Sequence, residues 1–242
     1  MSALPLQGKT ALITGSTQGL GLATAEQFAA AGCRIIDNGF RGAKYVGADL
    51  RDPAQIEAMI QAAGPIDILV NNAVVRHTAP IEHFAPENWD ESISVNLSAA
   101  FHTIRLALPA MKSRGWGRII NISSIYGQRG VANRVGYVTT KTALIGLTRA
   151  VALEVVGTGV TCNAVCPGTT ETPVHDATIE SMIKSEGLSR ADAEKKFLTG
   201  KQPTGKIIAA DDVAAMIVYL CGPASGDING SAFPIDAGWS AG

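Results

Sequence analysis

A tyrosine and a lysine stand four residues apart in the segment 136–141, at Tyr137 and Lys141. On a helix, residues at positions i and i+4 share one face, so the ammonium group would lie beside the phenol. A free tyrosine has a pKa of about 10, and a neighbouring opposite charge favours the ionised form by about one to three pKa units. The pair could therefore donate and accept a proton near neutral pH. The spacing alone is common in helices, so its meaning depends on the rest of the chain.

A glycine-rich turn near the N-terminus could bind a phosphate group. Residues 14–21 read Thr-Gly-Ser-Thr-Gln-Gly-Leu-Gly and join an apolar run to a helical pattern. Glycines permit a tight turn there and let backbone N–H groups approach a pyrophosphate at the helix N-terminus. A turn without a ligand is the alternative, and the position after the first strand favours a nucleotide site. The predicted cofactor contacts in this turn are Gly15, Thr17, Gln18, Gly19, Leu20 and Gly21.

Short apolar runs alternate with longer helical patterns along the chain. They are apolar throughout, as expected for parallel strands that helices cover on both faces. The sequence therefore predicts an α/β fold, a Rossmann-type doubly wound parallel sheet, with long helices at about 86–111 and 136–156. The predicted strands lie at residues 9–14, 34–38, 44–48, 66–71, 117–123, 160–165 and 232–235.

A single domain is predicted for residues 1–242. The chain is 46% hydrophobic, enough for a full core, and no linker, repeat or low-complexity segment divides it. Residues 175–203 differ because they are richer in charged side chains and interrupt the alternation of strands and helices. We expect two short helices there, as part of a lid at about 170–205 over the site. A solvated surface hairpin is the alternative.

Composition limits the classes of partner. The formal net charge is −1 and there is no long basic run, which argues against nucleic-acid binding. No signal-peptide or membrane-spanning pattern is present, which predicts a cytoplasmic protein. The four cysteines form no C-x-x-C pair and the four histidines lack metal-ligand spacing, so we expect free thiols and no metal. A small molecule is the predicted partner.

Ser124 is expected to meet Tyr137 at one edge of the sheet. It follows the predicted strand at 117–123, and the loop at 125–135 can return the chain to the tyrosine. Doubly wound proteins bind ligands at this carboxyl edge of their strands. A buried core hydroxyl is the alternative for Ser124.

The motifs resemble those of the short-chain dehydrogenase/reductase family over essentially the whole chain. The resemblance implies that Tyr137 is the acid and base, Ser124 holds the substrate oxygen, and Lys141 lowers the tyrosine pKa and binds the nicotinamide ribose. It also implies that Asn96 supports a water relay to Lys141, a helix-packing amide being the alternative. The motifs that carry the resemblance are residues 14–21, Asn71-Asn72-Ala73, Asn96, Ser124, Tyr137-x-x-x-Lys141 and Pro167-Gly168.

The implied cofactor is a nicotinamide dinucleotide. An acidic residue near position 39 would select NAD and a basic one NADP, but Asp37 falls two residues early and Arg41 two late. Gln18 is not basic, which favours NAD, while Arg41 leaves NADP open. Thr172 is implied to touch the cofactor, with a helix cap as the alternative. The other implied contacts are Phe40, Asp49, Leu50, Asn72, Ala73, Pro167 and Gly168.

A closer resemblance is to bacterial D-3-hydroxybutyrate dehydrogenases, through residues 88–90, 96–98, 105–109, 116–122, 162–168 and 201–203. The positions that hold the substrate carboxylate in that family are here Arg76, Tyr126, Arg134 and Gln202, and the first three depart from the usual glutamine, histidine and lysine. Two guanidinium groups favour a planar anion, because each binds carboxylate or sulfonate oxygens in pairs. Surface or interface arginines are the alternative.

These observations predict an NAD(P)-dependent oxidoreductase that transfers hydride between nicotinamide and a secondary hydroxy acid. The acid is expected to resemble 3-hydroxybutyrate or to be larger or more anionic. The alternatives are a dehydrogenase of a sugar-like or aromatic alcohol and a catalytically silent dinucleotide-binding regulator. The two long helices resemble the faces on which this family forms dimers and tetramers, so we expect a homo-oligomer, a tetramer or a dimer.

Overall fold

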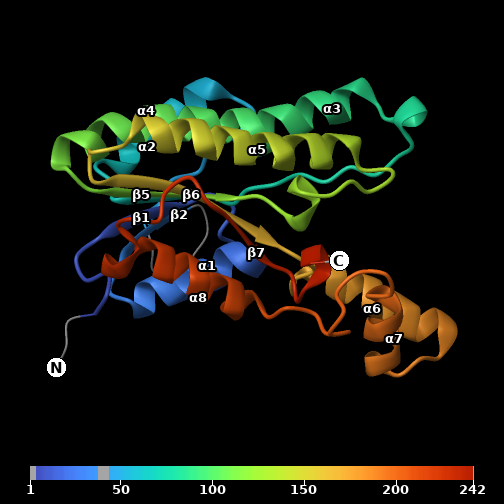
Figure 1. The fold of residues 1–242 in the computed structure, drawn as a ribbon. Helices are drawn as coiled ribbons and strands as arrows, with labels where there is room; N and C mark the ends of the chain where they lie inside the picture. The colour runs from blue at the N-terminus through green and yellow to red at the C-terminus, as the bar shows by residue number, and fades with distance from the viewer. Residues whose placement is uncertain (1–3, 38–43, 242) are drawn as a thin grey trace.

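The computed structural model describes residues 4–37 and 44–241, and a parallel sheet forms its centre (Figure 1). The sheet has seven strands in the order β3-β2-β1-β4-β5-β6-β7, and every neighbouring pair is parallel. This order confirms the predicted doubly wound fold. The strands are β1 (Thr10–Ile13), β2 (Arg34–Asp37), β3 (Lys44–Tyr45), β4 (Ile68–Asn71), β5 (Gly117–Ile122), β6 (Val160–Pro167) and β7 (Ala232–Ile235).

Helices cover both faces of this sheet. Figure 1 shows α1 (Gly19–Ala30) and α8 (Ala210–Cys221) on one face, with α2 (Pro53–Ala63), α4 (Ala99–Arg114) and α5 (Val135–Glu154) on the other. A hydrophobic core lies between the sheet and the helices on each face. Successive side chains of β1 pack into different cores, those of Ala11 and Ile13 on the α1 side and that of Leu12 on the α2 side. A strand buried on both faces needs apolar side chains at every position, which explains the continuous runs in the sequence.

The helix predicted at about 86–111 is interrupted by one wide turn. It consists of α3 (Pro86–Ile93), a π-helical turn at Ser94–Ser98 and α4, which ends at Arg114. A π turn inserts one extra residue into the helix and often marks a functional position. Asn96 is in the middle of this turn.

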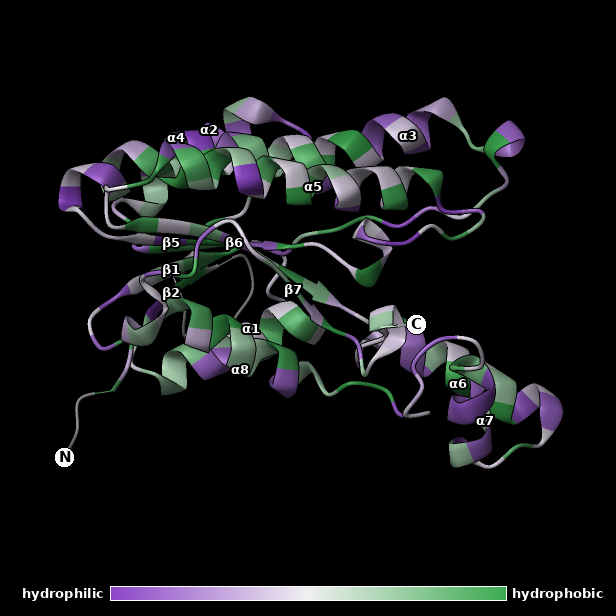
Figure 2. Ribbon diagram, viewed as in Figure 1, coloured by the Kyte–Doolittle hydropathy of each residue, from purple (hydrophilic) through white to green (hydrophobic). Residues whose placement is uncertain are grey.

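Two short helices follow β6, as the sequence predicted. They are α6 (Pro173–Glu186) and α7 (Arg190–Phe197), and α7 is mostly hydrophilic (Figure 2). Arg190 connects them, because its guanidinium lies 2.6 Å from Asp176 on α6 and 2.9 Å from Glu194 on α7. Among the described residues, no helix is long and apolar enough to cross a bilayer.

Candidate active site

A cavity of about 540 Å³ opens at the carboxyl edge of the sheet. Its wall comes from the loops after β1, β4, β5 and β6 together with α5, so segments far apart in the sequence meet there. The predicted residues that line it are Gly15, Thr17, Gln18, Gly19, Leu20, Gly21, Asn72, Ala73, Arg76, Ser124, Tyr137, Lys141, Pro167, Gly168 and Thr172.

The glycine turn is packed so closely that side chains would not fit. A Cβ atom on Gly21 would lie 2.2 Å from the Gly15 carbonyl oxygen, and one on Gly15 would lie 2.9 Å from the Ala73 Cα. The Asn72 amide donates to the carbonyls of Thr14 (3.0 Å) and Gly15 (2.9 Å), which ties the turn to the end of β4. The Asn72 side chain therefore helps to fix the conformation of the glycine turn.

The first turn of α1 is suited to an anion. The side chain of its N-cap residue, Gln18, accepts no capping hydrogen bond, so it does not compete for the N–H groups of that turn. Free N–H groups and the helix dipole together attract a phosphate. The turn, its glycines and the adjoining cavity thus fit the pyrophosphate of a dinucleotide.

Ser124, Tyr137 and Lys141 line one part of the cavity and are all buried. Ser124 follows β5, and its hydroxyl accepts a hydrogen bond from the Tyr126 N–H at 3.1 Å. The Lys141 ammonium lies 5.7 Å from the centre of the Tyr137 ring and donates to the Ile122 carbonyl at 2.6 Å. Burial, and after it the charge of Arg76, lowers the pKa of Lys141 from 10.5 to about 7.

Asn96 holds two walls of the site together. Its side-chain oxygen accepts from the Val75 N–H at 2.8 Å, and its amide donates to the Val75 carbonyl at 3.0 Å and to the Thr140 hydroxyl at 3.3 Å. The π turn aims this side chain at the loop after β4 and at α5. Asn96 therefore positions the segment that carries Arg76, and the water relay to Lys141 stays a prediction.

Ser124, predicted to hold the substrate oxygen, lines the cavity, and of the four predicted contacts to the substrate carboxylate Arg76 lines it too. Its guanidinium carbon lies 5.6 Å from the centre of the Tyr137 ring. Tyr126 instead packs edge-on against Tyr137 and Trp239, with ring centres 6.5 Å and 5.3 Å away. Arg134 is the N-cap residue of α5, and its charge acts on Tyr126, His175 and Lys201.

Gln202 is buried, and protein backbone occupies both ends of its amide. The Thr169 N–H donates to its oxygen, and its nitrogen donates to the Lys206 carbonyl at 2.5 Å. Each end of the amide keeps one further hydrogen-bonding site, so the substrate contact stays a prediction. Gln202 therefore links the backbone at Thr169 to the backbone at Lys206.

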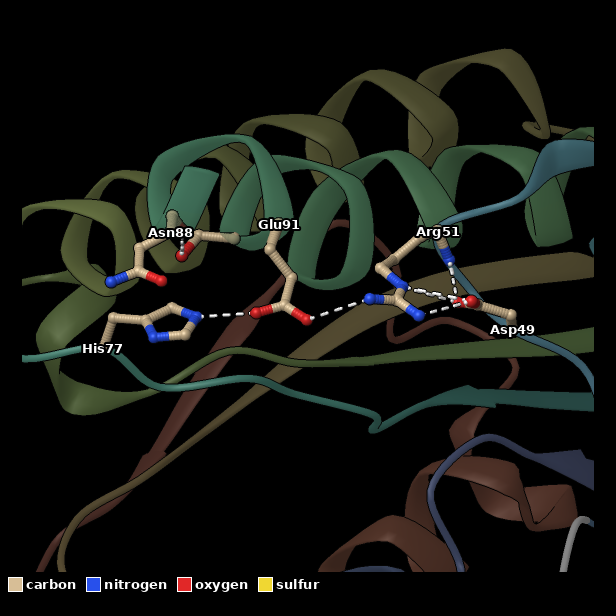
Figure 3. Close-up of polar contacts among 6 residues, drawn as sticks. Asp49, Arg51, His77, Asn88 and Glu91 are labelled. Atoms are coloured by element: carbon tan, nitrogen blue, oxygen red, sulfur yellow. Dashed lines mark hydrogen bonds and ion pairs between the residues drawn. The ribbon is translucent and has the colours of Figure 1, made fainter. Parts of the chain in front are cut away.

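Two of the predicted cofactor contacts, Asp49 and Leu50, do not line the cavity. Both oxygens of Asp49 bind Arg51, which lowers the pKa of Asp49 to about 2. Arg51 lies 3.6 Å from Glu91, which binds His77 at 2.8 Å, so a chain of charges connects this loop to the loop after β4 (Figure 3). Leu50 lines only a small void of about 10 Å³ beneath the site. Phe40 and the position expected to select NAD or NADP lie outside the described residues.

His175 lines the cavity although sequence reasoning missed it. It stands in the first turn of α6, three residues after the Thr172 cap, whose hydroxyl accepts from the His175 N–H at 3.4 Å. Thr172 thus both caps the helix and lines the cavity. Its position in the sequence could have indicated this role, because the first turn of a helix that covers a site faces that site.

The doubly wound sheet, the glycine turn and the buried Ser-Tyr-Lys group together define a dinucleotide-binding oxidoreductase. Residues 9–182 match the short chain dehydrogenase family. D-beta-hydroxybutyrate dehydrogenase of Cupriavidus necator is 43% identical and covers 98% of this chain and 99% of its own. The enzyme of the same name from Rhizobium meliloti is 40% identical and covers 96% and 99%.

Solved structures agree with these relatives. L-sorbose reductase from Gluconobacter frateurii, in complex with NADPH and L-sorbose, has a TM-score of 0.91 at 27% identity and covers 98% of both chains. The chain therefore belongs to the short-chain dehydrogenase family. It is an oxidoreductase that acts on CH–OH groups with a nicotinamide dinucleotide, and its likeness to D-3-hydroxybutyrate dehydrogenases is confirmed.

Proposed function

We propose that the protein transfers hydride reversibly between a nicotinamide dinucleotide and the carbinol carbon of a short secondary hydroxy acid of the 3-hydroxybutyrate type. The observation that carries this proposal is Arg76, whose guanidinium lies 5.6 Å from the Tyr137 ring centre and lines the same cavity. A cation beside the proton-transfer group suits a substrate whose carboxylate is close to its hydroxyl. The names of the relatives in Cupriavidus and Rhizobium support the same class.

The proposed roles follow from where each side chain lies. Tyr137 takes the carbinol proton during oxidation and returns it during reduction, and the Ser124 hydroxyl holds the reacting oxygen. Lys141 binds the nicotinamide ribose and supplies positive charge near the phenol. The glycine turn binds the pyrophosphate. When bound, the cofactor accepts or donates the hydride, and the protein contributes orientation and proton transfer.

For the cofactor, we propose NAD, with NADP as the alternative. The glycine turn supports NAD because it contains no basic side chain to bind a 2′-phosphate. The NADPH in the L-sorbose reductase structure is the reason to test both. Initial rates with each cofactor at saturating hydroxy acid decide the preference, and a kcat/KM at least about tenfold higher with NADP would reverse this assignment.

Tyr137→Phe tests the proton-transfer role. The variant should keep cofactor affinity and lose at least about a hundredfold in kcat, because general acid and base catalysis contributes about that much or more. Tyr219→Phe, at an exposed tyrosine on α8, is the matched control and should keep wild-type rates. A Tyr137→Phe enzyme with more than about a tenth of wild-type kcat would remove Tyr137 from its role.

A dehydrogenase of a sugar-like alcohol is the second candidate, and the L-sorbose bound to the reductase favours it. The two candidates differ at Arg76. Arg76→Met should raise the KM for 3-hydroxybutyrate at least about tenfold if the arginine binds the carboxylate, since a charged hydrogen bond is worth about 1.5–3 kcal/mol. A sugar alcohol oxidised faster than any hydroxy acid, with little effect of Arg76→Met, would favour the second candidate.

We also propose a cytoplasmic homo-oligomer, a dimer or a tetramer. Support for association comes from large apolar side chains left exposed on the two long helices, Phe101 on α4 and Leu153 on α5, the latter 78% exposed. Support for the compartment comes from the four free cysteines, which suit a reducing environment. Light scattering after size exclusion measures the assembly, and a monomer at micromolar concentration would contradict it.

A further inference from the structure

One basic side chain of the segment after β6, that of His175, lines the same cavity as Arg76. His175 lines the cavity from the first turn of α6. Its Nδ1 lies 2.7 Å from the Thr170 carbonyl oxygen, so Nδ1 carries a hydrogen and donates it there. Nε2 is then the ring atom left for a ligand among the described contacts, and it donates to an anion when the ring takes up a proton as the anion binds.

The ring of Phe197 on α7 contacts both His175 and Lys201. The His175 ring centre lies 5.4 Å from that of Phe197, and the Lys201 ammonium lies 3.9 Å from the same centre. Lys201 is therefore fixed beside the histidine by a cation–π contact, although it lies in the turn after α7. Both side chains belong to the lid and would move with it.

These groups repel one another. Burial lowers the pKa of His175, and the charges of Arg76, Lys201 and Arg134 lower it further. Burial also lowers the pKa of Lys201, and Arg134 adds to that effect. No carboxylate of the described residues pairs with any of the three cations. The described wall of the cavity contains no aspartate or glutamate either.

The outer surface of the lid is different. There Arg190 binds three carboxylates, those of Asp176, Glu180 and Glu194. Arg190 is thus paired with carboxylates, whereas His175 and Lys201 in the same segment have no carboxylate partner among the described residues. An anionic ligand would supply the missing counter-charge and relieve the repulsion.

We propose that His175, Lys201 and Arg134 form a second anion subsite, so that the substrate is a hydroxy acid with two acidic groups. One carboxylate binds Arg76 on the loop after β4, the hydroxyl meets Ser124 and Tyr137, and the second anionic group binds the lid. That group is a carboxylate, a sulfonate or a phosphate, which share the oxygens that these side chains recognise. The inference rests on the proposed hydroxy-acid function and names its substrate class.

A rate panel tests the proposal. The substrate with one acidic group is 3-hydroxybutyrate, and those with two acidic groups, called dianions below although the phosphate ester carries a further charge, are malate, 3-hydroxyglutarate, 3-hydroxy-4-sulfobutyrate and 3-hydroxy-4-phosphonooxybutyrate, each with NAD and with NADP. The best dianion should exceed 3-hydroxybutyrate in kcat/KM by at least about tenfold. The ranking among carboxylate, sulfonate and phosphate identifies the second group. Turnover of 3-hydroxybutyrate at an equal or higher kcat/KM would overturn the second subsite and leave the proposed function intact, whereas no turnover of any hydroxy acid would overturn both.

Variants of the lid locate the effect. His175→Ala and Lys201→Met should each lower the ratio of kcat/KM for the best dianion to that for 3-hydroxybutyrate by about tenfold. Lys195→Met, at an exposed lysine of the same lid, is the control and should leave the ratio unchanged. A ratio unchanged in both lid variants would overturn the subsite.

Binding without turnover gives an independent reading. In cofactor-free protein at fixed ionic strength, glutarate should raise the Tm more than butyrate does, because only a dianion reaches both subsites. His175→Ala and Lys201→Met should remove the difference between the two ligands. An equal effect of glutarate and butyrate on the wild-type protein would contradict the second subsite whatever the rates show.

Discussion

Replacing Lys141 by methionine should make the protein more stable and inactive. Lys141 is 3% exposed, and its pKa is lowered from 10.5 to about 7. At about 1.36 kcal/mol per pKa unit, this difference corresponds to about 5 kcal/mol when the lysine is charged in the fold, and to about 4 kcal/mol at pH 7. Methionine has a similar length and no charge, so it avoids this cost.

The substitution also removes a favourable contact. The Lys141 ammonium donates to the Ile122 carbonyl, a charged hydrogen bond worth about 1.5–3 kcal/mol. The net gain for Lys141→Met at pH 7 is therefore about 1–3 kcal/mol. For a chain of this size, that gain corresponds to a Tm higher by about 2–10 °C.

The pH dependence has a definite sign. Unfolded lysine keeps its proton up to its ordinary pKa of 10.5, whereas folded Lys141 releases it near 7. Between these values the unfolded state binds more protons, so the wild-type protein gains stability from this group as pH rises. The advantage of methionine is therefore largest below pH 7 and falls by about 2 kcal/mol between pH 7 and pH 9.

The assay is denaturant unfolding of cofactor-free protein at pH 7 and pH 9, followed by calorimetry for the Tm. Lys195→Met is the control, because it removes an exposed lysine and should change stability by less than about 0.5 kcal/mol at both pH values. A Lys141→Met protein less stable than wild type at pH 7 would refute the reasoning. So would an advantage that is the same at pH 9.

Three further predictions concern the residues around the site. Gly21→Ala places a Cβ 2.2 Å from the Gly15 carbonyl oxygen, so the glycine turn must shift at a cost of about 1–3 kcal/mol in stability. Titration of the variant with the cofactor should show a Kd raised about tenfold or more. Gln202→Ala leaves the buried Thr169 N–H without its acceptor, so urea unfolding should show a free energy of unfolding lower by about 1–3 kcal/mol. A decrease below about 0.5 kcal/mol would mean that this hydrogen bond does not stabilise the fold. Arg51→Ala should raise the pKa of Asp49 from about 2 toward its ordinary 3.8 in an NMR titration, and an unmoved pKa would assign the effect to another group.

Much of the fold could be predicted because its signals are local. A strand buried on both faces must be apolar at each position, and a tight approach between turns excludes every residue except glycine, as at Gly21. The order of the motifs then led to Ser124, Tyr137 and Lys141, and the cavity brings all three together. The two short helices after β6 followed from a change in composition alone, and α6 and α7 confirm them, while their role as a lid stays a prediction.

Other features depend on contacts between distant segments. The amide of Asn96 spans from Val75 to Thr140 because a π turn places it there, and its motif did not indicate that contact. The amide of Gln202 binds the backbone at Thr169 and Lys206, and the sequence did not indicate those partners either. A side chain's type indicates what it can bind, and only the fold decides which partner reaches it first.

The sequence by itself determined the class of chemistry, because that chemistry needs a phenol, an ammonium and a hydroxyl at the ends of particular elements. Only the tertiary structure decided the charge balance of the cavity. Burial lowers the pKa of Lys141, and the lid brings His175 and Lys201 near the charge of Arg134. Desolvation and charge repulsion depend on distance in space, and the spacing of residues along a chain does not record that distance.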